Sequence, residues 1–579
     1  MQNPDAATIG EALSWQAAHR PDKRVFLFLE HGERETQSFT FGQLNCRAQA
    51  IAQVLQQNGL GGQRVILAYP SCLEFVAALF GCFHAGAIAV PAPAAGYRNS
   101  ALRIHTIVED AQAAAVLSLR SIICKQTERP GAIAPLQIPG VLSIATDEIA
   151  DTGICQPERV KPEDLALLQY TSGSTGTPRG VMLTHSNLMH NQRVLTQAFQ
   201  SGAEDIGVSW LPLYHDMGLM GSILHPIYAG SFFALMPPLS FMQRPIRWLK
   251  AIHRYRASLT GAPCFAYDLC ARQYVPERDS DLDLSSWRVA VCGGETIRPR
   301  MLEKFIATFG PAGFDPKALM PAYGLAETTL LATSSPPGTG LITPSPAAVR
   351  RDESPRQFAC CGRPWEEHRV AVVDPVSCRR LPPGDSGEIW LQGPSVAAGY
   401  WNRPEETRAT FQATLAAEAE SGSWLRTGDL GFLSPDGLVV TGRRKETIVI
   451  RGVNYDPLDI EAEACDSHPS LSAVGAGAFS IDHENGEAVA LALEIERAAL
   501  GNVDVNFLVG EIVSAVNRRF GLTMYDLVLL RPGALPRTTS GKIQRHLCKQ
   551  LYLAGDLRGL PSIDHPALGR WRSRAHESV

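Results

Sequence analysis

One segment, Tyr170 to Gly180, combines residue types that suit phosphate binding. It reads Tyr-Thr-Ser-Gly-Ser-Thr-Gly-Thr-Pro-Arg-Gly, so it offers glycines, hydroxyl groups and one cation. Glycines let a backbone approach a ligand closely, while N–H groups, hydroxyls and a guanidinium donate hydrogen bonds to phosphate oxygens. The spacing is not that of a P-loop kinase. We therefore predict a loop that wraps a polyphosphate; the alternative is a flexible surface loop.

Two flanking elements are predicted to position this loop. The apolar run Leu165 to Leu168 before it predicts a buried strand. After it, Ser186 and Asn187 are suitable caps for a helix that extends to Phe199. Together they predict a strand, a glycine-rich loop and a helix in that order.

The first half of the chain alternates strand and helix patterns, which predicts parallel sheets covered by helices. Later, the apolar run Trp287 to Cys292 ends in Gly-Gly-Glu, and the run Leu319 to Ala322 ends in Tyr-Gly. Ligands bind at the carboxyl ends of strands in open parallel sheets. Three strands are thus predicted to deliver polar or glycine-rich loops to one site.

The pattern changes twice towards the C-terminus. From Arg369 to Thr441 it consists of short extended pieces and turns, and after Gly442 it becomes a mixture of helices and strands. The predicted fold class is α/β. It has a large N-terminal domain of parallel-rich sheets (1–442, with a β-rich lobe at about 365–442) and a small α+β C-terminal domain (443–579).

Composition limits the classes of function. Apolar residues make up 45% and charged residues 19% of the 579, and the net charge near −5 gives no reason to expect nucleic-acid binding. The 13 cysteines contain no Cys-x-x-Cys pair, and the N-terminus lacks a signal-peptide pattern. The apolar stretch Phe75 to Ala95 is interrupted by glycines and prolines, which favours a buried helix and strand over a membrane span. We expect a reduced, cytoplasmic protein.

Several further motifs occur together in one order. Tyr323-Gly-Leu-Ala-Glu327, Thr427-Gly-Asp429, Gly442-Arg-Arg-Lys445 and Leu535-Pro-Arg-Thr-Thr-Ser-Gly-Lys542 follow the glycine-rich segment. In this order and at these intervals they resemble the adenylate-forming superfamily of acyl-CoA synthetases, peptide-synthetase adenylation domains and luciferases. The resemblance covers nearly the whole chain. Leu211 to Leu219 and Gly393 to Trp401 resemble the fatty acyl-AMP ligase branch.

The resemblance implies a two-step reaction. A medium- or long-chain fatty acid and ATP give acyl-adenylate and pyrophosphate, and a thiol then takes the acyl group. In this branch the thiol belongs to the phosphopantetheine of an acyl carrier protein, or of a polyketide or peptide synthetase carrier domain. It would act in trans, because only 37 residues follow Lys542. The segment between Tyr323 and Cys361, where such ligases carry an insertion, is short here, so a long-chain acyl-CoA synthetase is the alternative. A non-catalytic scaffold is a further alternative.

The resemblance also implies roles at the reacting end of ATP. Lys542 would bridge the carboxylate and the α-phosphate, and the C-terminal domain that carries it would be mobile, with a hinge at Lys445. Glu327 and Thr175 would hold Mg²⁺. His215 would act near the fatty carboxylate, with Asp216 and Met217 beside the acyl chain. The phosphates would be bound by Thr171, Ser172, Gly173, Ser174, Thr175, Gly176 and Arg179.

The remaining implied roles concern the nucleoside. Asp429 would accept hydrogen bonds from the ribose hydroxyls, and Arg443 would contact ribose or phosphate. Adenine would lie against Gly294, Glu295, Ala322, Tyr323, Gly324 and Leu325. Structural alternatives exist for these side chains: a core aromatic for Tyr323, a turn aspartate for Asp429 and solvated charges for Glu295 and Arg443.

Overall fold

The structure, a computed structural model, divides into two compact units with a boundary between Thr441 and Gly442. Each unit has a hydrophobic core of its own. The described residues are 6–93, 100–124, 136, 138–151, 157–171, 178–344, 358–416, 418, 420, 422–450, 453–471, 475–483, 486–500, 503–538, 541, 543–557, 559, 565 and 568.

One sheet of the first unit has six strands in the spatial order β6-β5-β3-β4-β7-β8. Five of them run parallel, and β8 pairs antiparallel with β7. The strands are β3 (Arg64–Leu67), β4 (Ile88–Pro91), β5 (Ala115–Ser118), β6 (Leu142–Ala145), β7 (Leu165–Thr171) and β8 (Arg179–Thr184). Strands β4 and β5 are buried at every position, as expected where helices cover both faces of a parallel sheet.

A second sheet of the same unit has nine strands in the order β15-β14-β13-β12-β11-β9-β10-β1-β2. The six central strands, from β13 to β1, run parallel, and antiparallel strands lie at both edges. The strands are β1 (Arg24–Glu30), β2 (Arg34–Thr40), β9 (Ile206–Ser209), β10 (Phe232–Leu235), β11 (Leu259–Ala262), β12 (Val289–Cys292), β13 (Leu319–Tyr323), β14 (Thr333–Ser334) and β15 (Arg363–Pro364).

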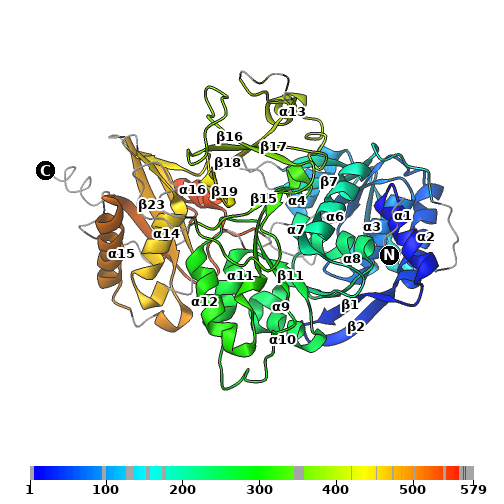
Figure 1. Ribbon diagram of the computed structural model, residues 1–579, viewed down its shortest axis with the longest axis horizontal. Helices are drawn as coiled ribbons and strands as arrows, with labels where there is room; N and C mark the ends of the chain where they lie inside the picture. Colours follow the sequence, from blue (N-terminus) through cyan, green and yellow to red (C-terminus); the bar gives the residue numbers. More distant parts are fainter. Residues whose placement is uncertain are drawn as a thin grey trace. The chain divides into compact units, whose positions relative to one another are not determined.

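Helices lie between the two sheets and over them. The helices of the first unit are α1 (Ile9–His19), α2 (Phe41–Gln57), α3 (Leu73–His84), α4 (Ser100–Ala111), α5 (Arg120–Ile123), α6 (His185–Phe199), α7 (Asp216–Leu219), α8 (His225–Ala229), α9 (Pro238–Gln243), α10 (Ile246–Tyr255), α11 (Cys264–Gln273), α12 (Pro299–Phe309) and α13 (Pro404–Phe411). Figure 1 shows α1, α2, α3 and α6 gathered side by side; α1 contacts each of the other three, and α2 contacts α3. Helix α3 contacts β1 and β2 of one sheet and β3 and β4 of the other, so the main core lies between the sheets.

The apolar stretch Phe75 to Ala95 is accounted for by this arrangement. It forms most of α3, in which every residue from Phe75 to His84 is buried, and then β4, as the sequence predicted. Among the described residues, none of the helices has the length and hydrophobicity that crossing a membrane would need.

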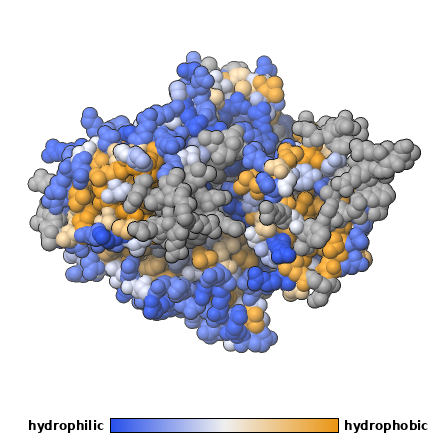
Figure 2. All heavy atoms as spheres, turned by 180° about the vertical axis from the view of Figure 1, so that it is seen from behind, coloured by the Kyte–Doolittle hydropathy of each residue, from blue (hydrophilic) through white to orange (hydrophobic). Residues whose placement is uncertain are grey.

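Figure 2 shows hydrophilic residues over much of one face, with hydrophobic patches between them. Scattered exposed apolar side chains, such as Leu239 of α9, are ordinary in a globular protein.

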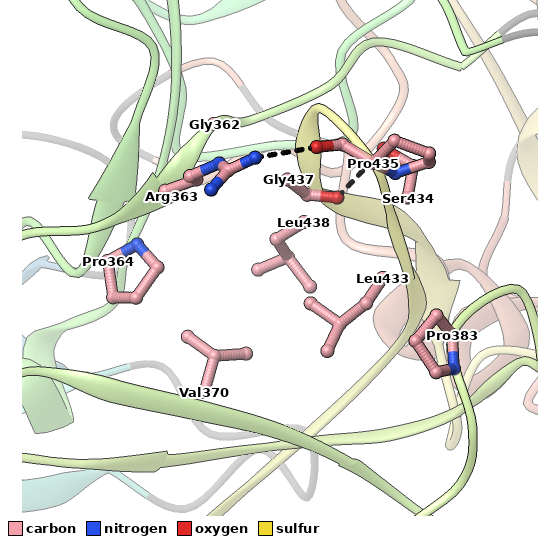
Figure 3. Close-up of a pocket in the computed structure, with 10 residues that line it drawn as sticks. All are labelled: Gly362, Arg363, Pro364, Val370, Pro383, Leu433, Ser434, Pro435, Gly437 and Leu438. Carbon is pink, nitrogen blue, oxygen red and sulfur yellow. Dashed lines mark hydrogen bonds between the residues drawn. The ribbon is translucent and has the colours of Figure 1, made fainter.

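The last part of the first unit is a smaller β-rich lobe. Its strands β16 (Arg369–Val373), β17 (Gly387–Gln392), β18 (Leu425–Ser434) and β19 (Gly437–Arg443) lie in that order in one sheet. A pocket of about 360 Å³ opens beside β15, β16, β18 and β19. Figure 3 shows Val370, Leu433 and Leu438 pointing into it, with Arg363 at its rim donating to the carbonyl of Pro435 at 2.8 Å. None of the predicted site residues lines this pocket.

The second unit is a small α+β structure. In its three-stranded sheet, β22 pairs antiparallel with β23, and β23 pairs parallel with β24. Its strands are β20 (Ile448–Ile450), β21 (Val453–Tyr455), β22 (Ala476–His483), β23 (Gly486–Glu494) and β24 (Met524–Leu530), and its helices are α14 (Pro457–Asp466), α15 (Val505–Phe520) and α16 (Arg545–Leu553). Arg545 lies within ion-pair distance of Glu461 (2.6 Å) and Glu446 (2.7 Å), which ties α16 to α14 and to the start of the unit.

These sheets and helices confirm the predicted fold class. Two local predictions were wrong. The glycine-rich segment does not lead into a helix, because Thr171 pairs with Arg179 and the segment therefore connects antiparallel strands β7 and β8. The cap of α6 is Thr184 rather than Ser186 or Asn187: its Oγ accepts from the Asn187 N–H at 3.1 Å, and the Asn187 side chain accepts from the Thr184 N–H at 3.0 Å. This reciprocal capping box satisfies two backbone donors.

Candidate active site

Strand β13 and the turn after it carry five of the predicted site residues, Ala322, Tyr323, Gly324, Leu325 and Glu327. Tyr323 ends the strand, and its hydroxyl donates to Asp429 Oδ2 at 2.7 Å. Both side chains are buried, and Asp429 comes from β18 of the β-rich lobe, where its N–H donates to Thr427 Oγ at 3.1 Å. Two residues 106 positions apart in the sequence thus meet, and they bring together the strand end and the lobe.

The turn after β13 presents Glu327. Its sharp course depends on Gly324, because a Cβ at that position would lie 1.7 Å from the Leu330 carbonyl oxygen. Ala326 to Thr328 form a short 3₁₀-helix, and Thr329 follows with a left-handed φ of 66°. Glu327 is half-buried, and its carboxylate accepts a hydrogen bond from the Tyr400 hydroxyl at 2.8 Å. Its carbonyl accepts from the Ala397 N–H at 2.9 Å.

The cation after the glycine-rich segment contacts the same tyrosine. Arg179, the first residue of β8, forms an ion pair with Glu406 of α13 at 2.9 Å. Its guanidinium carbon lies 5.4 Å from the centroid of the Tyr400 ring. Arg179 and Glu327 therefore both contact Tyr400, although they follow strands of different sheets. Thr171, at the end of β7, is half-buried and pairs with Arg179 in the β7–β8 ladder.

The stretch Leu211 to Leu219 is held close to β7. The side-chain amide of Gln169 in β7 donates to the Tyr214 carbonyl at 2.9 Å. His215 precedes α7, and its Nδ1 lies 3.2 Å from Asp216 Oδ1, which also accepts from the Met217 N–H at 2.7 Å. Met217 is partly buried against the main core. The His215–Asp216 pair lies at the partly exposed start of α7, a position at which it can meet a ligand.

In the Gly-Gly-Glu turn after β12, the second glycine is exposed and the glutamate carboxylate makes a structural contact. Gly294 has a left-handed φ of 78° and is exposed. Glu295 Oε1 accepts from the Phe265 N–H at 2.8 Å, in the first turn of α11. The carboxylate therefore satisfies a helix N–H, which favours the structural alternative for its side chain. Ala322 is buried within β13, and Leu325 is half-buried in the turn that follows.

Several predicted site residues cannot be placed in this cluster. Ser172, Gly173, Ser174, Thr175, Gly176 and Lys542 lie outside the described residues. Arg443 and Lys445 belong to the second unit, and both side chains are exposed. The Arg443 carbonyl accepts from the N–H groups of Glu446 and Thr447 at 3.1 and 3.2 Å, which forms a turn at the entry to that unit.

Reasoning from the sequence missed two residues of the cluster. Tyr400 lies within the Gly393 to Trp401 stretch, which served only to indicate the family branch, and Glu406 follows six residues later. Periodicity gave no signal for either residue. A buried tyrosine and a carboxylate become candidates only when they are seen beside Glu327 and Arg179.

Comparisons with known proteins identify the family of this chain. Residues 13–401 match the family model for AMP-binding enzymes. The medium-chain-fatty-acid–acyl-carrier-protein ligase JamA of Moorena producens is 39% identical, over 96% of this chain and 97% of its own. A long-chain-fatty-acid–AMP ligase of Mycolicibacterium smegmatis is 33% identical, over 97% of each chain. The solved fatty acyl-adenylate ligase of L. pneumophila, in complex with acyl adenylate and pyrophosphate, superposes with a TM-score of 0.74 at 36% identity, over 96% of this chain and 98% of that one.

The chain therefore belongs to the AMP-binding enzymes. Within that family it is a fatty acyl-AMP ligase of the adenylate-forming superfamily, which confirms the resemblance seen in the sequence.

Proposed function

We propose that this enzyme activates a medium- or long-chain fatty acid with ATP and transfers the acyl group from the acyl-adenylate to the phosphopantetheine thiol of a carrier protein. The observation that carries the proposal is the cluster around Tyr400, which holds a cation and a carboxylate together beside the ends of β7 and β13. Relatives named as fatty-acid–acyl-carrier-protein ligases, at 39% and 31% identity, support the choice of substrate and acceptor.

The first step requires one anion to attack another. The carboxylate oxygen of the fatty acid attacks the α-phosphorus of ATP, and pyrophosphate leaves. Cations that neutralise phosphate oxygens, and groups that hold the two reactants in line, lower this barrier. Arg179 supplies a guanidinium whose fork geometry suits phosphate oxygens. We assign the bridging cation to Lys542 on its place in the Leu535 to Lys542 motif.

Asp429 and Tyr323 form the proposed nucleoside end of the site. A carboxylate can accept hydrogen bonds from both hydroxyls of a ribose. The Tyr323 hydroxyl donates to Oδ2 of Asp429 and so fixes the orientation of the carboxylate. The phenol ring would lie beside adenine, next to the exposed Gly294. His215, with Asp216 as its neighbour, would lie near the fatty carboxylate.

The residues present also suit a magnesium ion that enters with ATP. Among the described residues there is no group of three or more His, Cys, Asp or Glu side chains arranged to hold a metal. A single carboxylate, Glu327, fits an ion bound mainly by phosphate oxygens and water, which is usual for Mg²⁺. We propose that Glu327, with Thr175, would hold it. When bound, the ion would neutralise charge on the phosphates.

A comparison of acceptors tests the proposal. The enzyme is given ATP, MgCl₂ and fatty acids of increasing length, with either CoA or a holo acyl carrier protein, and the products are followed by mass spectrometry. We expect acyl-AMP to accumulate and the carrier to be loaded, with little acyl-CoA. Acyl-CoA formed as fast as acyl-carrier product would assign the chain to the acyl-CoA synthetases instead. Absence of acyl-AMP with every acid would refute the first step.

We also propose a reducing, cytoplasmic location. The described cysteines are all free, and the adjacent pair Cys360 and Cys361 is buried. Free, buried thiols are typical of proteins kept reduced.

A further inference from the structure

Tyr400 connects loops that follow two different sheets. Its hydroxyl donates to Glu327 Oε1 at 2.8 Å, after β13 of the nine-stranded sheet. Its ring lies under the guanidinium of Arg179, at the start of β8 of the six-stranded sheet, at 5.4 Å. The side chain is only 5% exposed. A single buried residue thus touches both the proposed metal carboxylate and the proposed phosphate cation.

The backbone fixes Tyr400 on both sides. Its N–H donates to Thr407 Oγ at 2.9 Å, and the same hydroxyl donates back to its carbonyl at 3.3 Å. Tyr400 bridges to Val181, and the Trp401 N–H donates to the Gly180 carbonyl at 2.8 Å, so this segment continues the ladder beyond β8. Gly399 has a φ of 138°, and a Cβ there would lie 2.3 Å from a methyl carbon of Thr407. The ring has little freedom to move.

The same segment fixes Glu327 twice. The Ala397 N–H holds its backbone carbonyl at 2.9 Å, and the Tyr400 hydroxyl holds its carboxylate. A phenol is protonated at neutral pH, so the Tyr400 hydroxyl is the donor in this hydrogen bond. A hydrogen bond to a carboxylate is stronger than one between neutral groups, and it selects one orientation of the side chain. Partners of this kind orient metal-binding carboxylates.

We propose that Tyr400 is a positioning residue for adenylation. Its hydroxyl sets the orientation in which Glu327 meets the metal–nucleotide complex. Its ring packs against the Arg179 guanidinium and helps to hold that cation in place. This inference rests on the proposed function and adds to it a residue that touches no substrate atom. The attraction between a guanidinium and the face of an aromatic ring makes the second contact favourable as well.

The hydroxyl is tested by calorimetric titration with a non-cleavable ATP analogue, α,β-methylene-ATP, in MgCl₂ and separately in EDTA. The ratio of the two dissociation constants is the gain in affinity due to magnesium. Y400F keeps the ring and loses the hydroxyl. We expect it to reduce this gain by about 10-fold or more, the usual effect of losing a partner of a metal ligand. Affinity in EDTA is expected to stay unchanged.

Three further variants make the measurement specific. Y255F removes a phenol that donates to Glu35 Oε1 at 2.7 Å, at the far edge of the nine-stranded sheet, and is expected to leave the gain unchanged. E327Q should reduce the gain on its own, and Y400F should then add little to it, because both changes act through one carboxylate. Y400L, which also removes the ring, should weaken binding in EDTA through Arg179.

The outcomes separate this inference from the function on which it rests. A normal magnesium gain in folded Y400F, or full additivity of Y400F and E327Q, would overturn the positioning role. If the wild-type protein binds the analogue but converts none of the fatty acids to acyl-AMP, that result would instead contradict the proposed function. Thermal denaturation of each variant shows whether it is folded. If Y400F is unfolded, the T407V variant, which loosens the backbone around the same ring, replaces it with the same expectation for the gain.

Discussion

The charged residues of the site are arranged as partners rather than as isolated groups. Arg179 is paired with Glu406, Glu327 with Tyr400, and Asp429 with Tyr323. The side chains that the sequence identified are those that would contact ATP, because their types match phosphate and ribose chemistry. Two of the partners, Tyr400 and Glu406, were not identified, because a tyrosine or a glutamate carries no signal until the fold brings it beside a charge.

Loss of the Lys542 ammonium group is predicted to be the most damaging single change to adenylation. K542A removes the cation proposed to offset repulsion between the carboxylate and the α-phosphate. Losing one preorganised charge of this kind costs about 3 kcal/mol or more in the transition state. We expect the rate of acyl-adenylate formation, measured as pyrophosphate release, to fall at least about 100-fold. Pyrophosphate release near the wild-type rate would refute the assignment.

The hydrogen bond between Tyr323 and Asp429 gives a second test at the residue scale. Y323F keeps the ring and leaves Asp429 without this donor. A hydrogen bond to a charged group contributes about 1.5 to 3 kcal/mol. We therefore expect the KM for ATP to rise by about 10-fold or more, with a smaller change in the KM for the fatty acid.

The fatty-acid KM serves as the internal control for Y323F. If both KM values rise equally, the tyrosine supports the fold of the strand end rather than nucleotide binding. The sequence alone left these two roles open, and the observed bond to Asp429 is what makes them separable.

At the scale of elements, buried runs were the most predictable. Helix α3 and strand β4 were predicted, because an apolar stretch that is interrupted by glycines and prolines leaves few alternatives to a buried helix followed by a buried strand. Strand β8 was missed. It begins with Arg179 and ends with Thr184, and only its ladder with β7 reveals it as a strand. Pairing between strands is a tertiary property that periodicity does not report.

Buried histidines between elements predict how stability depends on pH. His225 of α8 is fully buried, with Nε2 at 2.8 Å from Ser201 Oγ and Nδ1 at 3.3 Å from Gln192 Oε1 of α6. Burial lowers the pKa of His225 to about 4. Its pKa in the unfolded chain is about 6.5, so the unfolded state binds the proton first as the pH falls. The folded state thus loses stability from about pH 6.5 down to about pH 4.

The H225Q variant isolates the contribution of this histidine. Glutamine can bond to the same neighbours but does not titrate. We expect the wild-type Tm to fall steadily below about pH 6.5 and that of H225Q to fall less steeply, whatever its Tm at pH 7.5. The slope of Tm against pH from 7.5 to 4.5 is the measurement. Equal slopes would show that His225 does not contribute to the acid sensitivity.

At the scale of the molecule, the second unit has a core and a sheet of its own, and the chain enters it through the turn at Arg443 to Thr447. If Lys542 belongs to the adenylation site, the unit that carries it must close for the first step. A thiol must then reach the acyl-adenylate, which requires the unit to move. Domain motions of this kind depend on a few residues that absorb changes in backbone angles. Lys445, exposed within the turn, is our candidate for that hinge.

Stiffening this turn should separate the two half-reactions. K445P fixes one φ angle and restricts Arg444 before it, while it leaves the side chains of the first unit unchanged. We expect acyl-adenylate formation to remain near the wild-type rate and acyl transfer to the carrier to fall by about 10-fold or more, since a step that needs rotation is slowed more than one that does not.

K445A, which removes the charge and leaves the backbone free, is the matched control and should transfer normally. Pyrophosphate release measures the first half-reaction and carrier loading the second. Equal losses in both for K445P would place the hinge elsewhere, and a loss in K445A would indicate that the ammonium group rather than the backbone matters at this position.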